Sequence, residues 1–218
     1  MNIYIDTASP EQIRTAERRF QVDGVTTNPS IVAETDRRYK NIVETAGEIT
    51  DGPVFAQVLA ESVDGMVREA RGYRDWADDV VAKIPATRLG FEALGRLRAD
   101  GVPAGATVVY TAEQAVLAAK NNATFVAPYV GRIDDSGADG IATTRRIQST
   151  FDAQGFETEV LAASIRNTTQ ATALYESGID AITMSPAVLD AHVDSSETAE
   201  SVAGFAAAWG DRDPPLSE

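Results

Sequence analysis

Short apolar runs alternate with longer amphipathic stretches along the whole chain of 218 residues. The apolar runs are rich in valine, isoleucine and alanine, which is typical of strands buried on both faces of a parallel sheet. The predicted strands are Asn2–Asp6, Gly24–Thr27, Val54–Val58, Val80–Ile84, Ala104–Val109, Thr124–Val130, Glu157–Ala163 and Ala181–Met184. The predicted helices between them are Glu11–Arg19, Arg38–Glu48, Val63–Trp76, Gly90–Asp100, Glu113–Asn121, Gly140–Phe151 and Thr169–Ser177.

Eight strands that alternate with helices, and no linker between them, predict one α/β domain: a (β/α)8 TIM barrel. An open doubly wound sheet is the alternative, but its ligand normally leans on a glycine-rich turn that this chain lacks. A C-terminal helix is predicted from the apolar spacing of Val202, Phe205, Ala206 and Trp209. We expect residues 1–210 to form the barrel with this helix, and residues 211–218 to form a flexible tail.

The charge and composition narrow the classes of partner. A net charge of −14 disfavours nucleic acid and anionic membranes, because both bind basic surfaces. The chain has no cysteine, no apolar stretch of membrane-spanning length and no secretory signal at its start, so a cytoplasmic location is expected. The excess of acidic over basic residues also predicts a halophilic protein. Such a protein is adapted to high salt, which screens the repulsion between its acidic side chains.

The candidate chemistry is limited by the residue types present. His192 is the only histidine, and it is expected on the surface. Metal sites with several histidine ligands and Ser-His-Asp triads are therefore disfavoured, and neither a metal nor a cofactor is expected. The chemistry is left to lysine, carboxylates, hydroxyls and amides.

Lys83 lies inside a predicted strand, among valine, alanine and isoleucine, whereas the other two lysines, Lys40 and Lys120, lie in polar stretches. A buried lysine reaches water, finds an acidic partner, or loses its proton because burial disfavours the charged form. A neutral amine attacks carbonyl groups and forms Schiff bases. The segment alone leaves the ion pair and the nucleophile equally open.

A polar side chain stands at or just beyond the carboxyl end of every predicted strand. In chain order these are Asp6 and Thr7, the segment Thr26 to Ser30, Gln57, Lys83, Thr107, Tyr129 with Arg132, Ser164 with Arg166, and Thr183 with Ser185. In a barrel these ends meet at one mouth, where catalytic side chains lie. Each residue alone is explained as a strand-end or turn residue, but eight such positions around one lysine favour carbonyl chemistry through an imine.

Four segments carry a resemblance to a known family. They are Asp6-Thr7-Ala8, Gly24-Val25-Thr26-Thr27-Asn28-Pro29-Ser30, Val81-Ala82-Lys83-Ile84-Pro85 and Ala127-Pro128-Tyr129-Val130-Gly131-Arg132-Ile133-Asp134. The chain resembles the transaldolase family, and most closely its small branch of fructose-6-phosphate aldolases and short transaldolases, from Met1 to about Trp209. The resemblance implies the (β/α)8 fold and a Schiff base on Lys83.

The same resemblance implies roles for the other candidate residues. It gives catalytic roles to Asp6, Gln57, Thr107 and Tyr129 beside Lys83, with the last three holding a water for proton transfer. It implies substrate binding by Thr26, Asn28, Arg132, Ser164 and Arg166. Of these, Arg132 and Ser164 match positions that hold a phosphate, and Arg166 is expected to assist them. The expected partners are small ketose and aldose phosphates.

The expected reaction is a class I aldolase reaction that cleaves or forms fructose 6-phosphate from dihydroxyacetone and glyceraldehyde 3-phosphate. Gln57 with Tyr129 resembles the aldolases, whereas transaldolases carry glutamate and generally phenylalanine there. Gly131 and Ser164-Ile165-Arg166 instead resemble the short transaldolases, which transfer a dihydroxyacetone unit between sugar phosphates, so a transaldolase is the alternative. A non-catalytic sugar-phosphate binder stays as a remote alternative, because a fold does not fix a function.

Assembly is predicted from the C-terminal helix. Its apolar stripe packs either on its own barrel or on a neighbour. In the small branch of the family the terminal helix reaches a neighbouring subunit, so the resemblance implies a homo-oligomer, a pentamer or a decamer.

Overall fold

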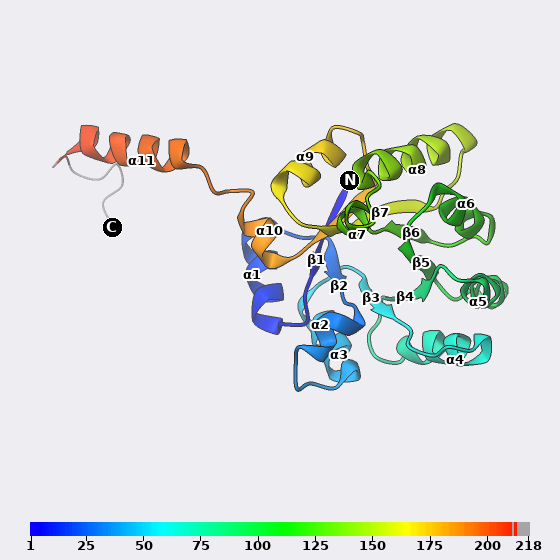
Figure 1. Cartoon of the computed structure of the whole chain (residues 1–218). Helices are drawn as coiled ribbons and strands as arrows, with labels where there is room; N and C mark the ends of the chain where they lie inside the picture. Colours follow the sequence, from blue (N-terminus) through cyan, green and yellow to red (C-terminus); the bar gives the residue numbers. More distant parts are fainter. Residues whose placement is uncertain (211, 213–218) are drawn as a thin grey trace.

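The computed structural model describes residues 1–210 and 212, and its eight parallel strands close into a barrel in the order β1 to β8 (Figure 1). The strands are β1 (Asn2–Asp6), β2 (Gly24–Thr26), β3 (Val54–Gln57), β4 (Val80–Pro85), β5 (Ala104–Val109), β6 (Phe125–Pro128), β7 (Glu159–Ile165) and β8 (Ala181–Met184). Strand β1 pairs with both β2 and β8, which closes the sheet. The predicted barrel is confirmed, and the open doubly wound alternative is wrong.

Helices follow the strands around the outside of the barrel. They are α1 (Pro10–Phe20), α2 (Pro29–Ala33), α3 (Tyr39–Ile49), α4 (Val63–Tyr73), α5 (Arg88–Ala99), α6 (Ala112–Lys120), α7 (Val130–Asp135), α8 (Gly140–Gln154), α9 (Thr168–Tyr175), α10 (Pro186–Asp190) and α11 (Ser196–Trp209). Many begin at a residue whose side chain accepts a hydrogen bond from the first turn, as Ser9 and Thr111 do. The sequence did not predict α2, α7 and α10.

The barrel interior and the layer under the helices form two separate apolar clusters. The interior cluster contains Tyr4, Phe55, Phe125, Ala127, Tyr129, Leu161, Ala163 and Ala181. The ring of Phe55 meets those of Tyr4 and Phe125 edge to face, with centroids 4.9 and 5.1 Å apart. Gly105 makes room for Phe125, since a Cβ there would come within 2.2 Å of the ring. The interior is therefore filled with side chains, and ligand space is left only at its ends.

Two strands leave the regular ladder near their carboxyl ends. Val108 and Ser164 have φ values of 58° and 59°, in the left-handed region that non-glycine residues rarely adopt. Each lies where the pairing register shifts, between Ala106 and Val109 in β5 and between Ala162 and Ile165 in β7. Such a conformation costs about 1–3 kcal/mol and is concentrated at functional sites. The strain therefore marks the carboxyl end of the barrel.

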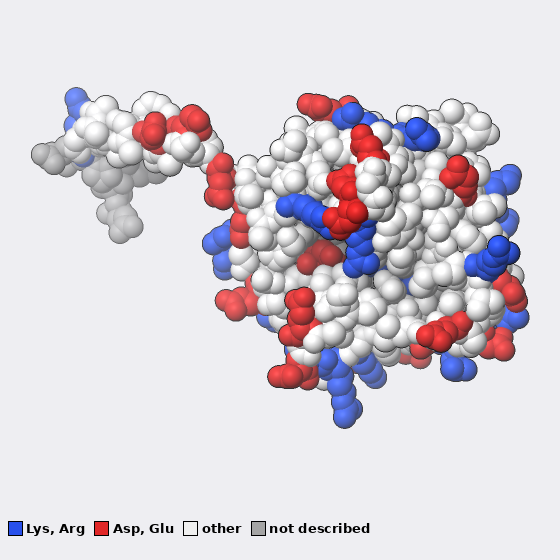
Figure 2. All heavy atoms as spheres, in the orientation of Figure 1, with Lys and Arg blue, Asp and Glu red and all other residues white. Residues whose placement is uncertain are grey.

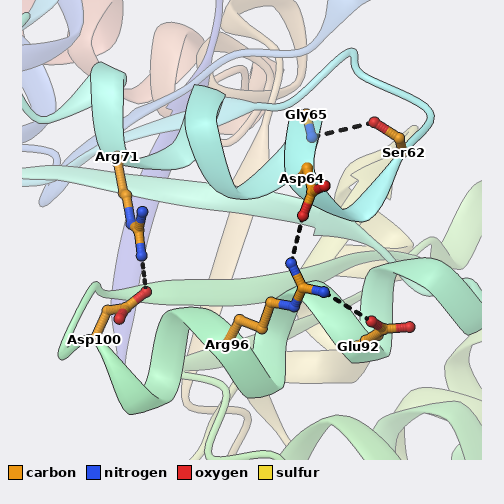
Figure 3. Close-up of polar contacts among 7 residues, drawn as sticks. All are labelled: Ser62, Asp64, Gly65, Arg71, Glu92, Arg96 and Asp100. Carbon is orange, nitrogen blue, oxygen red and sulfur yellow. Dashed lines mark hydrogen bonds and ion pairs between the residues drawn. The ribbon is translucent and has the colours of Figure 1, made fainter.

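Ion pairs join α4 to α5, the helices that follow β3 and β4 (Figure 3). The guanidinium of Arg96 lies 2.5 Å from Asp64 and 3.2 Å from Glu92, and Arg71 pairs with Asp100. All of these side chains are exposed, so water screens each pair and its contribution to stability is small. The two helices follow the strands that carry Gln57 and Lys83.

The terminal helix α11 stands away from the barrel at the end of an extended segment (Figure 1). Its residues are exposed, including Val202, Phe205 and Trp209, so it does not pack on its own barrel. The predicted flexible tail lies, except for Arg212, outside the described residues. No described helix combines the length and the apolar character needed to cross a membrane.

Candidate active site

The site residues follow from the two-residue period of the strands. On six strands, the residue two places beyond an interior position is polar: Asp6 after Tyr4, Gln57 after Phe55, Lys83 after Val81, Thr107 after Gly105, Tyr129 after Ala127 and Thr183 after Ala181. Because alternate residues of a strand face the same side, these six side chains form the layer directly above the apolar interior. This layer is the floor of the mouth at the carboxyl end.

Lys83 is buried, with 6% of its surface exposed. Its Nζ donates a hydrogen bond of 2.7 Å to the carbonyl oxygen of Thr27, and it takes part in no ion pair among the described residues. Burial lowers the pKa of Lys83, and attraction by Asp6 opposes the shift. Of the two interpretations open from the sequence, the lysine paired directly with a carboxylate is not observed.

Asp6 is the centre of a hydrogen-bonded group at the ends of β1, β2 and β8. Thr26 donates to its Oδ1 at 2.7 Å, and Asn28 donates from its amide to Oδ2 at 3.4 Å. The hydroxyls of Thr26 and Thr183 lie 2.7 Å apart. Burial raises the pKa of Asp6, while Lys83 and these hydrogen bonds lower it. Hydrogen bonds thus hold the Asp6 carboxylate in place, and the positive charge of Lys83 attracts it.

Asn28 is fixed by the start of α2. Its Oδ1 accepts hydrogen bonds from the backbone N–H groups of Ser30 and Ile31, at 3.0 and 3.2 Å. Pro29 begins the helix, where its missing N–H costs nothing. With the oxygen occupied by the helix, the amide NH2 group is turned toward Asp6 and the mouth.

Tyr129 and Thr107 form the opposite wall. Their hydroxyls lie 3.0 Å apart, and both residues are buried. Burial raises the pKa of Tyr129, so the phenol stays protonated near neutral pH. The guanidinium of Arg132, in the first turns of α7, lies 5.0 Å from the centre of the Tyr129 ring. Gln57, partly buried, is paired in register with Lys83 on the neighbouring strand.

The last group surrounds Gly131, in α7. A Cβ at this residue would lie 2.6 Å from both Nε of Arg166 and the carbonyl oxygen of Ser164, so the glycine lets this arginine lie across α7. The guanidinium of Arg166 forms a two-pronged ion pair with Asp135, one prong of 2.6 Å. Figure 2 shows acidic and basic side chains meeting around a hollow on the visible face.

The structure brings most of the predicted residues together. Asp6, Thr26 and Asn28 share one hydrogen-bonded group, Thr107 and Tyr129 another, and Lys83 lies in register with Gln57. Arg166 is held by Asp135, a partner that the sequence did not indicate. Tyr39 and Tyr73 were missed: their hydroxyls contact the backbone of Gln57 from outside the barrel, and no motif marks them. Thr27 lies in the predicted segment Thr26 to Ser30, but the sequence did not indicate that its carbonyl holds Lys83.

Metal ligands do not gather anywhere in the described part of the chain: no three histidine, cysteine, aspartate or glutamate side chains there lie close enough to share an ion. His192 is exposed, as expected, with its ring 3.0 Å from the Tyr175 hydroxyl.

Solved structures share the fold. Thiamine phosphate pyrophosphorylase from Pyrococcus furiosus superposes with a TM-score of 0.58 at 18% identity, covering 84% of each chain. A mutant flavocytochrome b2 with pyruvate bound gives 0.61 at 10% identity, covering 85% of this chain and 56% of that one. At such identities the likeness concerns the barrel alone.

Sequence relatives are much closer. A probable transaldolase of Methanococcus maripaludis is 39% identical over 209 residues, which is 96% of this chain and 97% of the relative. A probable transaldolase of Hyphomonas neptunium is 39% identical over 207 residues, covering 95% and 96%. The profile of the Transaldolase/Fructose-6-phosphate aldolase family matches residues 3–213. The chain belongs to this family.

Proposed function

We propose that the protein is a class I aldolase that cleaves or forms fructose 6-phosphate, with Lys83 as the imine-forming nucleophile. The observation that carries the proposal is the state of Lys83. Its amine is buried on the floor of a mouth lined by hydroxyls, and no carboxylate of the described residues is in ion-pair contact with it. Burial lowers the pKa of this amine, which increases the fraction that is neutral and nucleophilic.

The reaction begins when the neutral amine of Lys83 adds to the ketone carbon of the sugar phosphate. Loss of water from the carbinolamine gives an iminium ion. The C3–C4 bond then breaks, its electron pair moves toward the iminium nitrogen to form an enamine, and the C4 hydroxyl loses its proton as the aldehyde leaves. Protonation of the enamine at C3 and hydrolysis of the resulting iminium release dihydroxyacetone and restore the amine.

The residues of the mouth are assigned by chemistry. Asp6 and Asn28 bind substrate hydroxyls, and Thr26 holds the Asp6 carboxylate in place. Tyr129 moves protons through a water held with Thr107 and Gln57, since a hydrogen-bonded phenol and an amide both orient water. Arg132 and Ser164 bind the phosphate, with Arg166 beside them. A guanidinium supplies local positive charge on a chain whose net charge is −14.

The choice of a lyase rests on Gln57 and Tyr129. A neutral amide stands in register with Lys83, and a buried phenol stands on the opposite wall. Such a phenol is suited to protonate the enamine, and protonation ends the reaction as a cleavage.

A transaldolase is the second candidate, and one observation favours it. Gly131 permits Arg166 to lie across α7, and this pair of residues is the feature that resembles short transaldolases. The relatives described above also carry the name probable transaldolase.

Incubation with fructose 6-phosphate alone separates the two activities. The proposal predicts free dihydroxyacetone and glyceraldehyde 3-phosphate without any acceptor aldehyde. Turnover that begins only after erythrose 4-phosphate is added would overturn the lyase assignment in favour of transfer. A variant with Lys83→Met serves as the control and is expected to be inactive in both assays.

A further inference from the structure

The hydrogen-bond ladder between β2 and β3 is interrupted beside Lys83. The backbone N–H of Val25 donates to Pro53 at 3.0 Å, and that of Thr27 donates to Phe55 at 3.1 Å, as in a regular parallel pair. In that pattern, the next bond runs from the N–H of Gln57 to the carbonyl of Thr27. It is replaced: the Gln57 N–H donates to the Tyr39 hydroxyl at 2.6 Å, and the Thr27 carbonyl accepts Lys83 at 2.7 Å.

The proton of the Tyr39 hydroxyl has a defined direction. The Thr27 hydroxyl has a single proton and donates it to the Phe55 carbonyl at 3.0 Å. The Tyr39 hydroxyl lies 3.2 Å from the same Thr27 oxygen, so Tyr39 is the donor in that contact. Its oxygen therefore accepts from Gln57 while its proton goes to Thr27, and the phenol joins the ends of β2 and β3.

The phenol is held in this place by packing outside the barrel. Tyr39 is the first residue of α3, and the centre of its ring lies 5.8 Å from those of Tyr73 and Trp76. The Tyr73 hydroxyl in turn donates to the Gln57 carbonyl at 3.2 Å. A ladder continued along the chain would use the N–H of residue 29 for that carbonyl, but Pro29 has none. Tyrosine hydroxyls thus satisfy both backbone groups of Gln57 that face β2.

We propose that Tyr39 is a positioning residue for Lys83: it takes up the Gln57 N–H and so leaves the Thr27 carbonyl to hold the lysine amine at the mouth. The inference rests on the proposed function only in treating Lys83 as the nucleophile. Tyr39 touches no substrate, and it acts through Thr27.

Removing the hydroxyl of Tyr39 returns the Gln57 N–H to the Thr27 carbonyl, which Lys83 then has to share. A carbonyl acceptor favours the ammonium form, so weaker bonding increases the neutral fraction of the amine while its position becomes less defined. Other charged and titratable groups also act here. Asp6 of β1 acts on both Lys83 and Tyr129, Arg132 acts on Asp6, and Glu69 of α4 acts on Tyr39. Tyr39→Phe leaves all of these groups in place.

The test compares Tyr39→Phe with Tyr73→Phe. The second variant also removes a hydroxyl that is hydrogen-bonded to the backbone of Gln57, but this hydroxyl makes no contact with Thr27. The rate of methylation of Lys83 by formaldehyde and cyanoborohydride is measured by mass spectrometry at a series of pH values. This rate reports the neutral fraction of the amine and requires no ketose. The kcat and KM for fructose 6-phosphate report how well the amine is placed for the reaction. For Tyr39→Phe we expect methylation roughly threefold to tenfold faster at a given pH and kcat lower by a similar factor, as for one lost hydrogen bond. Tyr73→Phe is expected to leave the methylation profile unchanged.

Wild-type values for both measurements in a folded Tyr39→Phe variant would overturn the inference, as would equal changes in Tyr73→Phe. If Tyr39→Phe does not fold, Thr27→Val removes the acceptor of the Tyr39 proton with the rings in place, and the same changes are expected. Failure of the proposed function looks different, because the wild-type protein itself would then form no imine with a ketose at Lys83.

Discussion

At the residue scale, Lys83 differs from the other two lysines by its surroundings alone. Lys40 and Lys120 are exposed, and Lys40 lies 3.5 Å from Glu44 on the same helix. Lys83 is enclosed, and the group that holds it is an uncharged carbonyl. A neutral acceptor orients the amine without adding the full negative charge that would keep it protonated. The reactivity of Lys83 therefore depends on which neighbours are charged.

Gln57→Glu tests that dependence on charge. A carboxylate in register with Lys83 favours the ammonium and raises the pKa of the lysine, so imine formation is expected to move to higher pH. Each rise of the lysine pKa by one should slow the reaction at pH 7 by about tenfold, because the neutral fraction of the amine falls by that factor. The measurement is the pH profile of borohydride trapping with dihydroxyacetone. The control is Gln154→Glu, which adds the same charge at an exposed position of α8. If the wild type, Gln57→Glu and Gln154→Glu have the same pH profile, the reactivity of Lys83 does not depend on a charge at residue 57.

At the scale of elements, the mouth depends on how α7 meets the end of β7. Asp134 accepts hydrogen bonds from the Gly140 N–H at 2.8 Å and from the Gln170 amide at 2.7 Å, and Asp135 pairs with Arg166. These contacts tie the helix that carries Arg132 to the strand and loop that carry Arg166. The proposed phosphate site is consequently one packed unit.

Gly131→Ala tests this packing. The added methyl group meets Arg166 and the Ser164 carbonyl at 2.6 Å, so one of the two elements must move. We expect the KM for fructose 6-phosphate to rise about tenfold or more, and the free energy of unfolding to fall by about 1–3 kcal/mol. Trapping with unphosphorylated dihydroxyacetone should be unchanged, because that ligand has no phosphate. An unchanged KM in the alanine variant would show that Gly131 has no role in the proposed phosphate site.

The barrel was predictable from sequence because its strands are buried on both faces and read as apolar runs bounded by turns. The bounds of β1, β5 and β8 are confirmed to the residue. Strand β6 is shorter than predicted, because Val130 already begins α7, and β7 begins and ends later in the chain than predicted. The short helices α2, α7 and α10 were missed, since helices of five or six residues do not establish a 3.6-residue period.

The candidate site was predictable only in part. Strand-end residues such as Asp6 and Thr107 were found because barrel topology gathers them at one mouth. The contacts of Tyr39 and Asp135 join residues on separate elements, through a backbone N–H in one case and an ion pair in the other. Neither contact has a local sequence pattern, so the packed structure was needed to find them.

At the scale of the whole molecule, α11 carries an apolar stripe that its own barrel does not cover. Val202, Phe205 and Trp209 are 60%, 74% and 45% exposed. Their burial against a second copy is favourable by about 25 cal/mol for each Å² of apolar surface. We therefore propose that the protein is a homo-oligomer joined through α11; the family resemblance implies a pentamer or a decamer.

Removal of the residues after Ser196 tests the assembly. The full chain is expected to scatter light as an oligomer, and the truncated chain as a monomer of similar secondary structure by circular dichroism. A monomeric full chain, or an unchanged mass after truncation, would rule out this role of α11.

The net charge of −14 predicts that folding depends on salt. Acidic side chains repel one another over about 10 Å at 0.1 M salt but only about 3 Å at 1 M. The midpoint of thermal unfolding should therefore rise as potassium chloride is increased over this range, and activity should rise with it. Equal unfolding temperatures in dilute buffer and in molar salt would count against a halophilic protein.

The central claim is that Lys83 forms an imine, and borohydride trapping followed by peptide mass spectrometry tests it most directly. With dihydroxyacetone or fructose 6-phosphate, the account predicts one covalent adduct, on the peptide that contains Lys83, and none in Lys83→Met. No adduct at saturating ligand, or an adduct on Lys40 or Lys120 instead, would contradict it.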